Sequence, residues 1–394
     1  MMHRKVLICL GFYVLIFYQQ TIAQNDDALI ANLIKEIATT QISKDGEFYA
    51  GMFPSFRECG GAPHNYQPDN NIFYSAVIAF ALQKTVPHLQ GENKKTVTDI
   101  LQKIQKVYPY YQNKDGLPYY GFWPLNGTIL PHSFIFKYLK GVFAQGEDAD
   151  DSVIILLTDN SNDSTAAVLK KRLIAVSNLA TPKRKIISTY KKYRKVPAYS
   201  TYLGTLMTAD FDFAVQCNIM YFMLEKKLPF TKEDSATLFI IADMVKNRKH
   251  MTSPTYISPY YVHSSILLYH ISRLMGAFKI PELEMYKAQL IKDIYEQLNE
   301  QGNIMDQIIL RTSLLRLGAK APPLEVNSLE EFKKSNQSKF VFFQARAAFS
   351  YPTPFKQILL HWSYLYYLFY CEAYNKVLWL EYLVEKRKAN NLIV

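Results

Sequence analysis

Apolar residues recur at helical spacing along nearly the whole chain. In one segment these positions are Ile72, Ala76, Ala79, Phe80 and Leu82. Residues three and four apart lie on one face of a helix, so each such segment predicts a helix with a buried side. Similar segments begin near Asp26, Thr96, His132, Asp151, Phe211, Lys232, Pro259, Leu283, Ile304, Leu329, Gln357 and Tyr374. The pattern therefore predicts an all-α protein.

Strand signals are scarce in the same pattern. The best candidate runs from Lys339 to Ala345, and we interpret it as an extended loop or a helix. Prolines separate the predicted helices, and none of these breaks forms a long flexible linker. The chain after its leader, residues 24–394, is therefore predicted to fold as a single domain of serial helical hairpins.

A short motif occurs twice ahead of a predicted helix. The segments Asp45–Gly51 and Asp115–Gly121 share the pattern D-G-x-x-Y-x-G, and each precedes an aromatic, proline-rich loop. Two copies do not establish a repeat, but they fit helix pairs arranged around an axis. Such an arrangement predicts an α/α toroid, a ring of helical hairpins around a central cavity.

The first 23 residues have the features of a secretory signal peptide. Three basic or potentially basic residues precede an apolar run from Val6 to Phe17, and the segment ends at Thr21-Ile22-Ala23. The run is shorter than the roughly 20 residues that cross a bilayer. We expect cleavage near Ala23 and export to a periplasmic or extracellular location, with an uncleaved membrane anchor as the alternative. Cys59, Cys217 and Cys371 then remain, which allows at most one disulfide.

Composition adds two expectations. Aromatic residues make up 14% of the 394 residues, more than an ordinary core needs, so some of them are expected to line a cavity. The formal net charge of +11 favours peripheral contact with an anionic membrane surface or a polyanionic ligand. Basic residues concentrate between Lys183 and Lys195. With Tyr190 and Tyr193 interleaved, this run could be a phosphate-binding patch; because export argues against a nucleic-acid partner, we favour a solvated loop or helix face.

The most specific local signal is an acidic run directly before an apolar helix. Glu147, Asp148, Asp150 and Asp151 fall within five residues. Carboxylates this close repel one another, which raises the pKa of at least one of them and lets it hold a proton that could be donated. Helix capping explains the same residues without any chemistry. A calcium site that adds Asp159, Ser161 and Asp163 is a third interpretation, although the run lacks the glycine of an EF-hand loop.

The run Asp148-Ala149-Asp150-Asp151 resembles the D-x-D-D motif of class II terpene cyclases. The segment from Asp148 to Val153 is also similar to proteins with prenyltransferase and squalene-oxidase repeats. Two further segments resemble inner helices of the same superfamily, one from Asp210 to Ile219 and one from Ser258 to Arg273. The resemblance covers roughly residues 45–385 and is diffuse outside the acidic run. It implies an α/α toroid whose inner helices line an apolar, aromatic pocket.

The resemblance also implies roles for individual residues. Asp150 would be the general acid that protonates an alkene or epoxide, with Asp148 and Asp151 as its hydrogen-bonding neighbours. Aromatic faces that stabilise carbocations would come from Tyr119, Tyr120, Phe122, Trp123, Tyr260, Tyr261 and Trp362. Polar candidates for the pocket are Asp210, Asp212 and Asn218, and candidates to orient or reprotonate the acid are His132 and His361.

The sequence departs from the superfamily in several respects. It has no Q-W repeat, no D-D-x-x-D metal motif and no recognisable set of zinc ligands. Triterpene cyclases also use two helical domains and a longer chain. We therefore expect one ring, no cofactor or metal, and a small hydrophobic, isoprenoid-like ligand rather than a diphosphate that must be ionised.

Two other functions fit the same residues. A glycan-processing enzyme would use paired carboxylates as acid and base and stack sugars on tyrosine rings. Its second carboxylate could be Asp45, Asp115, Asp210, Asp212 or Glu331. The other alternative is a non-catalytic envelope protein that binds a lipid or another ligand in the cavity.

Overall fold

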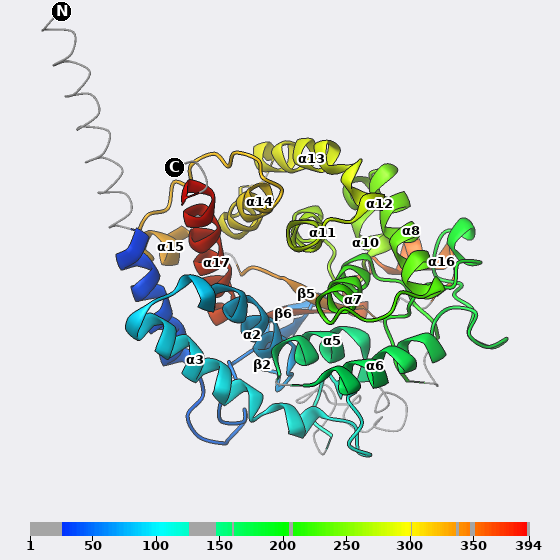
Figure 1. Ribbon diagram of the computed structural model, residues 1–394, viewed down its shortest axis with the longest axis horizontal. Helices are drawn as coiled ribbons and strands as arrows, with labels where there is room; N and C mark the ends of the chain where they lie inside the picture. The colour runs from blue at the N-terminus through cyan, green and yellow to red at the C-terminus, as the bar shows by residue number, and fades with distance from the viewer. Residues whose placement is uncertain are drawn as a thin grey trace, which may run out of the picture.

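The computed structural model describes residues 26–125, 147–159, 161–204, 208–300, 302–335, 339–346 and 351–391. The predicted signal peptide and His132 lie outside these ranges. Helices dominate the described chain and form a ring, so the prediction of an all-α toroid is confirmed (Figure 1).

The inner wall of the ring is a closed circle of helices. Each packs against the next in chain order, and the last packs against the first. In that order they are α2 (Phe73–Thr85), α5 (Ala149–Thr158), α7 (Phe213–Glu225), α11 (Ser264–Ala277), α14 (Ile304–Arg316) and α17 (Glu372–Asn391). The contact between α2 and α17 therefore closes the ring.

A second set of helices covers the outside of this circle. A helix over residues 26–40 opens the described chain. The helices that pack behind α2, α5, α7 and α11 are, in turn, α3 (Gly91–Gln105), α6 (Asp163–Ala175), α8 (Lys232–Lys246) and α13 (Lys287–Glu300). Shorter helices fill the connections: α9 (Lys249–Thr252), α10 (Pro254–Ile257), α12 (Pro281–Glu284), α15 (Leu329–Ser335) and α16 (Phe355–Leu359).

The inner and outer helices differ in how many of their residues are buried. All ten residues of α5 and most of α7 are buried, because an inner helix is covered by its neighbours on every side. A helix buried all round can be apolar on every face. In α3 only Val97, Ile100 and Ile104 are buried, at the spacing of a single face. A single buried face is therefore typical of the outer helices, whereas inner helices such as α5 and α7 are buried on all sides.

A small antiparallel sheet accompanies the ring. Its strand order is β2-β1-β6-β5, from β1 (Phe56–Cys59), β2 (Ala62–Pro68), β5 (Phe343–Arg346) and β6 (Tyr366–Tyr370). The interpretation of Lys339 to Ala345 as a loop or helix is therefore wrong at its C-terminal end, where β5 pairs with β6. The helix expected from Gln357 onward ends at Leu359, and the chain then enters β6.

The sheet lies at the end of the ring where inner helices begin. The backbone N–H of Gln344 in β5 donates to the carbonyl of Tyr260, four residues before α11, at 3.0 Å. The ring of Phe343 packs on Phe73, the first residue of α2, with centroids 4.6 Å apart. A two-stranded ladder of β3 (Tyr120–Gly121) and β4 (Glu147–Asp148) leads directly into α5. The starts of α2, α5 and α11 therefore meet at one end.

Two further properties concern the chain as a whole. Cys59, Cys217 and Cys371 are all free thiols. Among the described residues, no helix combines the length and apolar character needed to span a bilayer.

Candidate active site at the start of helix α5

The acidic run marks the start of α5, and one of its members acts as a helix cap. Asp148 is the N-cap residue, and its side chain accepts a hydrogen bond of 2.7 Å from the backbone N–H of Asp151. Burial, followed by the charge of Asp150, raises the pKa of Asp148 to about 7. The capping interpretation is thus right for Asp148, and it does not account for Asp150 or Asp151.

Asp150 points away from the helix end and is held by two distant side chains. It is 4% exposed. Its Oδ1 accepts from the side-chain amide of Asn218 at 2.6 Å, and its Oδ2 accepts from the hydroxyl of Tyr261. The D-x-D-D resemblance implied Asp148 and Asp151 as hydrogen-bonding neighbours, but in the described chain Asn218 and Tyr261 bond the side chain of Asp150.

Arg273 fixes the orientation of Asn218. Its guanidinium donates to Oδ1 of Asn218, so the amide NH₂ must face Asp150. Burial raises the pKa of Asp150, whereas the bonds from Tyr261 and Asn218 and the positive charge of Arg273 act in the opposite direction. These groups keep Asp150 a usable acid, because they stabilise the carboxylate that remains after the proton has left.

Asp151 has a different environment. It is 1% exposed, and both of its carboxyl oxygens lack a hydrogen-bond partner among the described residues. Burial and the charges of Asp148 and Asp150 raise the pKa of Asp151 well above its usual range. A buried carboxylate without a donor is far costlier than a neutral carboxyl, so this environment favours the protonated form of Asp151.

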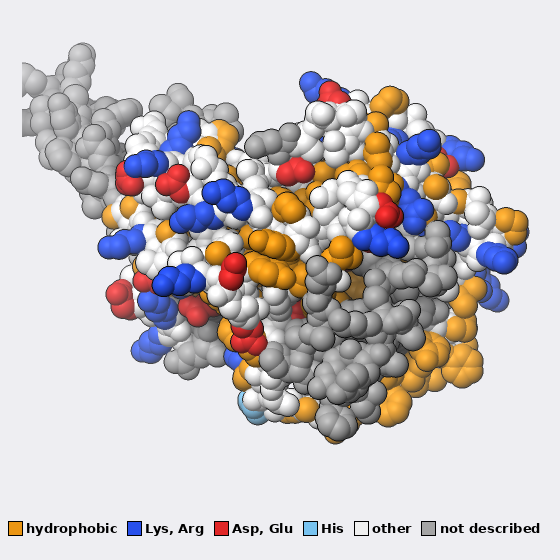
Figure 2. All heavy atoms as spheres, turned by 90° about the horizontal axis from the view of Figure 1, so that it is seen from below, with side chains coloured by type: hydrophobic (Ala, Val, Ile, Leu, Met, Phe, Trp, Pro, Cys, Tyr) orange, Lys and Arg blue, Asp and Glu red, His pale blue; other side chains and the backbone are white. Residues whose placement is uncertain are grey.

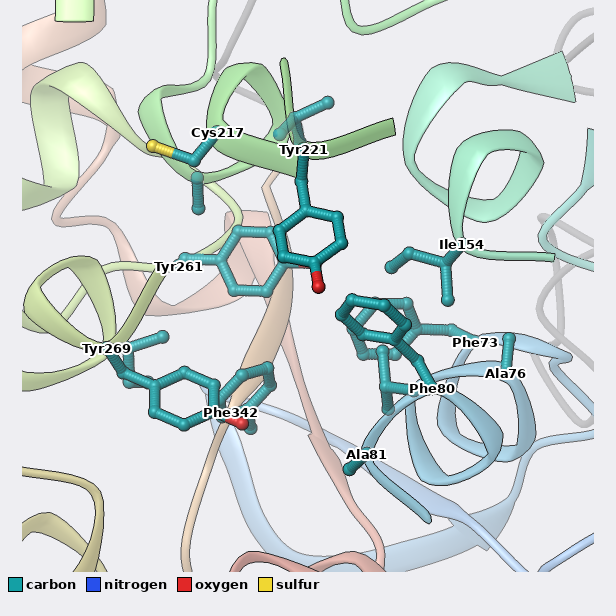
Figure 3. Close-up of a cluster of buried hydrophobic side chains, with 14 of the residues drawn as sticks. Phe73, Ala76, Phe80, Ala81, Ile154, Cys217, Tyr221, Tyr261, Tyr269 and Phe342 are labelled. Carbon is teal, nitrogen blue, oxygen red and sulfur yellow. The ribbon is translucent and has the colours of Figure 1, made fainter. Parts of the chain in front are cut away.

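Aromatic rings surround the hydroxyl that binds Asp150. The ring of Tyr261 lies 6.1 Å from Phe73 and 5.8 Å from Phe343, between centroids. Phe122 stacks on Phe343 at 5.3 Å and so belongs to the same cluster. Figure 3 shows Phe73, Tyr221 and Tyr261 projecting toward one another from α2, α7 and the segment before α11. The acid therefore adjoins an aromatic interior of the ring.

A neutral imidazole packs on the same tyrosine. The ring centroids of His270 and Tyr261 are 4.7 Å apart. Burial and the charge of Arg273 lower the pKa of His270 well below its usual range. Nδ1 lies 2.8 Å from the carbonyl oxygen of Ile266, which can only accept, so Nδ1 carries the hydrogen and Nε2 has a lone pair.

A network of charged groups continues from Arg273 across the inner helices. The guanidiniums of Arg273 and Arg316 lie over the ring of Tyr269, at 5.4 and 4.8 Å from its centroid. The Tyr269 hydroxyl donates to Oε2 of Glu381 at 2.6 Å, and Arg316 forms a buried ion pair with the same carboxylate. This network joins α11, α14 and α17 to the group that orients Asn218.

Several of the predicted aromatic residues are buried or half-buried and have structural contacts. The backbone N–H of Tyr120 donates to Oγ of Ser152 in α5 at 2.9 Å. Trp123 donates from Nε1 to Asp69 at 3.0 Å, and the hydroxyls of Tyr260 and Tyr202 are 2.6 Å apart. Tyr119 is buried, with the guanidinium of Arg172 lying 5.8 Å from the centroid of its ring.

Asp210 and Asp212 lie outside the hydrogen-bond shell of Asp150. Asp212 is the N-cap of α7, where it accepts from the N–H groups of Ala214 and Val215, and it also accepts from Ser258 at 2.6 Å. Burial raises the pKa of Asp212 to about 7. Asp210 accepts from Oγ of Ser188 at 3.1 Å. Both aspartates therefore hold the start of α7 and its neighbouring loops, and neither bonds the side chain of Asp150.

The structure also corrects the positions of His361 and Trp362. Both follow α16 on the protein surface, and Trp362 is 56% exposed. Neither residue can face a buried acid, because their side chains are turned to solvent. Both residues were assigned to the pocket because of their residue types, and residue type alone does not show whether a side chain is exposed.

The calcium and glycan alternatives lose their geometric basis. Asp148 and Asp159 flank the ten-residue α5 at opposite ends, which separates them by about 15 Å. In the described ranges, no group of three or more candidate ligands could hold a metal ion.

Of the second carboxylates considered for glycan cleavage, Asp45, Asp115 and Glu331 are exposed. None of them joins Asp150 in the interior.

The residues that sequence reasoning missed are those that complete the site. Arg273 and His270 lie in a segment whose resemblance was noted, but no role was assigned to them. Phe73, Phe343 and Glu381 gave no local signal, since an isolated aromatic or acidic residue in an apolar segment is ordinary.

The comparisons with known proteins support the fold. The structure matches that of the type II terpene cyclase MstE from Scytonema with a TM-score of 0.51 and 11% sequence identity, over 92% of this chain and 99% of that chain. No protein-family model and no curated protein matches the amino-acid sequence. At this identity the likeness concerns the arrangement of the helices.

Proposed function

We propose that the protein is a class II terpene cyclase-like enzyme in which Asp150 donates a proton to an isoprenoid substrate. The observation that carries the proposal is the buried carboxyl of Asp150, bonded by Tyr261 and Asn218 beside the aromatic interior of a terpene-cyclase-like ring. A proton donor of this kind needs burial to stay protonated and a stabilised conjugate base to release the proton.

The chemical step transfers one proton from Asp150 to the substrate. The π electrons of an alkene take this proton and leave a cation on the adjacent carbon; in an epoxide a lone pair of the oxygen takes it, and the C–O bond breaks with its electron pair going to oxygen and the cation forming on carbon. Nearby double bonds attack that cation, and aromatic faces such as Tyr261 and Phe73 stabilise it in place of water. Loss of a proton to a base ends the sequence, and Nε2 of His270 carries a lone pair for that purpose. The product is an isomer of the substrate.

We also propose that the enzyme works after export, with a small, membrane-derived lipid as its substrate. Residues 1–23 support this proposal through their signal-peptide pattern alone. Cell fractionation with an antibody to the protein tests it, and a full-length protein retained in the cytoplasm would refute it.

The decisive experiment is performed in heavy water. Purified protein is incubated with a total lipid extract in D₂O, and new cyclic lipids are sought by mass spectrometry. Because the carboxyl proton exchanges with solvent, a product formed by protonation of an alkene should carry one deuterium bonded to carbon, whereas a product formed by opening of an epoxide should carry it on a hydroxyl oxygen and lose it in H₂O. Asp150→Asn should form no product, and Asp210→Asn, which changes another buried aspartate, serves as the matched control.

Other results would contradict the proposal. Products of an alkene substrate without carbon-bound deuterium would exclude initiation by a solvent-exchanged acid. Shortened oligosaccharides from envelope polysaccharides would indicate glycan cleavage. Retention of an unchanged lipid on the protein, with no turnover of any extract, would indicate a binding protein.

A further inference from the structure

The segment around α16 exposes an unusual set of large apolar side chains. Phe355 is 59% exposed, Ile358 68%, Trp362 56% and Tyr364 66%. We call these four residues the α16 patch. Scattered apolar residues are normal on a protein surface, but four within ten residues form a local concentration that calls for a partner.

The orientation of α16 explains why these side chains face outward. Lys356 is 1% exposed, and its Nζ donates to the carbonyl of Ser188 at 2.8 Å. Leu360 is also buried, and its carbonyl accepts from Arg346. The helix therefore buries a lysine and presents Phe355 and Ile358 to solvent, the reverse of an ordinary amphipathic helix in water.

The same contact places a basic loop beside the patch. Ser188, the partner of Lys356, lies within the basic run between Lys183 and Lys195. The exposed lysines of this run that form no ion pair with the described residues are Lys183, Lys185, Lys191 and Lys195. Ile187, between them, is itself 42% exposed. We call these four lysines the basic rim.

Figure 2 agrees with this arrangement. It shows apolar side chains gathered at the lower right edge of the molecule, with Lys and Arg side chains directly above them. Figure 1 places α16 on the same side of the ring. The hydrogen bond between Lys356 and Ser188 holds α16 and the basic run on the same side of the molecule.

We propose that the α16 patch and the basic rim dock the protein on the surface of an anionic phospholipid bilayer. Tryptophan and tyrosine have an apolar body and a polar tip, which suits the boundary between lipid headgroups and acyl chains. Phenylalanine and isoleucine insert beside them, and lysines attract anionic headgroups within a Debye length. This complementarity of charge favours a lipid surface over a protein partner.

The proposal does not depend on the proposed catalytic activity. Peripheral contact with an anionic membrane was expected from net charge alone, whereas the structure assigns it to two named groups of residues.

The test measures binding of the purified protein to vesicles of equal parts phosphatidylcholine and phosphatidylglycerol, and to vesicles of phosphatidylcholine alone. Wild-type protein should sediment with the mixed vesicles and lose binding at high salt. Phe355→Ser, Ile358→Ser and Trp362→Ser combined should weaken binding on the order of a hundredfold. Changing the basic rim to glutamine should weaken it on the order of tenfold or more.

Matched controls separate the patch from general surface changes. Phe230, Phe239 and Met285 are 53%, 54% and 75% exposed, and their combined replacement by serine should leave vesicle binding unchanged. The exposed lysines Lys94, Lys95, Lys103 and Lys106, changed to glutamine, are the control for the basic rim. Circular dichroism checks that every variant is folded.

A second measurement uses the wild-type chain. Brominated acyl chains should quench tryptophan fluorescence on binding, and Trp362→Phe should remove most of that quenching, because Trp379 is buried and Trp123 is half-buried. Three results would overturn the proposal: no binding to the mixed vesicles, full binding by the triple apolar variant, or a dimer in ultracentrifugation that the same variant dissociates. The last would make the patch a contact between two protein chains.

Discussion

The side-chain amide of Asn218 donates a 2.6 Å hydrogen bond to Asp150, and the oxygen of the same amide accepts from Arg273. A positive charge on α11 is thereby linked to an acid on α5 through a neutral residue on α7. Asn218 thus separates the guanidinium of Arg273 from Asp150. The positive charge stabilises the ionised form of Asp150, but the two groups do not form an ion pair that would hold Asp150 permanently ionised.

Asp150→Asn should abolish turnover while leaving the fold intact. Asparagine keeps the shape of the side chain but has no acidic proton, and general-acid catalysis contributes about 10²- to 10⁴-fold. Product formation and thermal unfolding should be measured together. A sharp fall in melting temperature with activity retained would assign Asp150 to helix capping, and Asp148→Asn, which changes the actual cap, provides the comparison.

Arg273→Met should make Asp150 a weaker acid. The positive charge of Arg273 lowers the pKa of Asp150, so its removal raises that pKa and reduces the driving force for proton donation. We expect kcat to fall with little change in KM, and the alkaline limit of activity to move to higher pH. The pH profile is the informative measurement, since a purely structural role would lower activity without moving the limit.

Asp151→Asn should change how stability depends on pH. In the wild type the folded state keeps the Asp151 proton, whereas the unfolded state releases it above the usual pKa of 3.8. Between that pH and the raised folded pKa, this group lowers the free energy of unfolding by about 1.4 kcal/mol for each pH unit. The asparagine variant lacks that loss.

Urea unfolding at pH 5, 6 and 7 measures the effect. The variant should gain stability relative to wild type as the pH rises across this range. Equal pH slopes for the two proteins would show that Asp151 is ionised in the folded state.

Glu381→Gln should destabilise the ring. It removes the buried partner of Arg316 and weakens the acceptor of Tyr269, and breaking a buried ion pair costs about 3–5 kcal/mol. Glu225→Gln is the matched control, because its pair with Lys84 is exposed and worth about 0–1 kcal/mol. Similar losses in chemical unfolding for both variants would mean that the interior network adds nothing to stability.

The parts of the fold that could be predicted from the sequence are those that depend on residues close together in the chain. Helical periodicity and breaking prolines are properties of neighbouring residues, and they predicted the helices; the ring was predicted from the repeated D-G-x-x-Y-x-G motif and from the resemblance to terpene cyclases. The strand β5 gave a weaker signal, because its four residues alternate in burial over too short a stretch to separate from a loop. Its identity depends on pairing with β6, more than twenty residues later in the chain.

The candidate site followed the same rule. The acidic run is contiguous and could be recognised, but Asn218 and Tyr261 are 68 and 111 residues from Asp150. Their contact exists only once α5, α7 and α11 stand side by side. Trp362 was assigned to the pocket for its residue type, and only the direction of α16 shows that it faces solvent.

The contact between α2 and α17 has a consequence for biosynthesis. The helix over residues 26–40 is joined to α17 by the ion pairs of Asp26 with Lys386 and Asp27 with Arg387, which span 360 residues. A ribosome synthesises the helix over residues 26–40 long before α17. Until α17 is made, the ring of the nascent chain is incomplete, and the apolar side chains at both ends of the unfinished ring are uncovered. Pairings this distant in sequence slow folding. We therefore expect the last step to be the seating of α17, and the unfinished ring to be the form that chaperones protect.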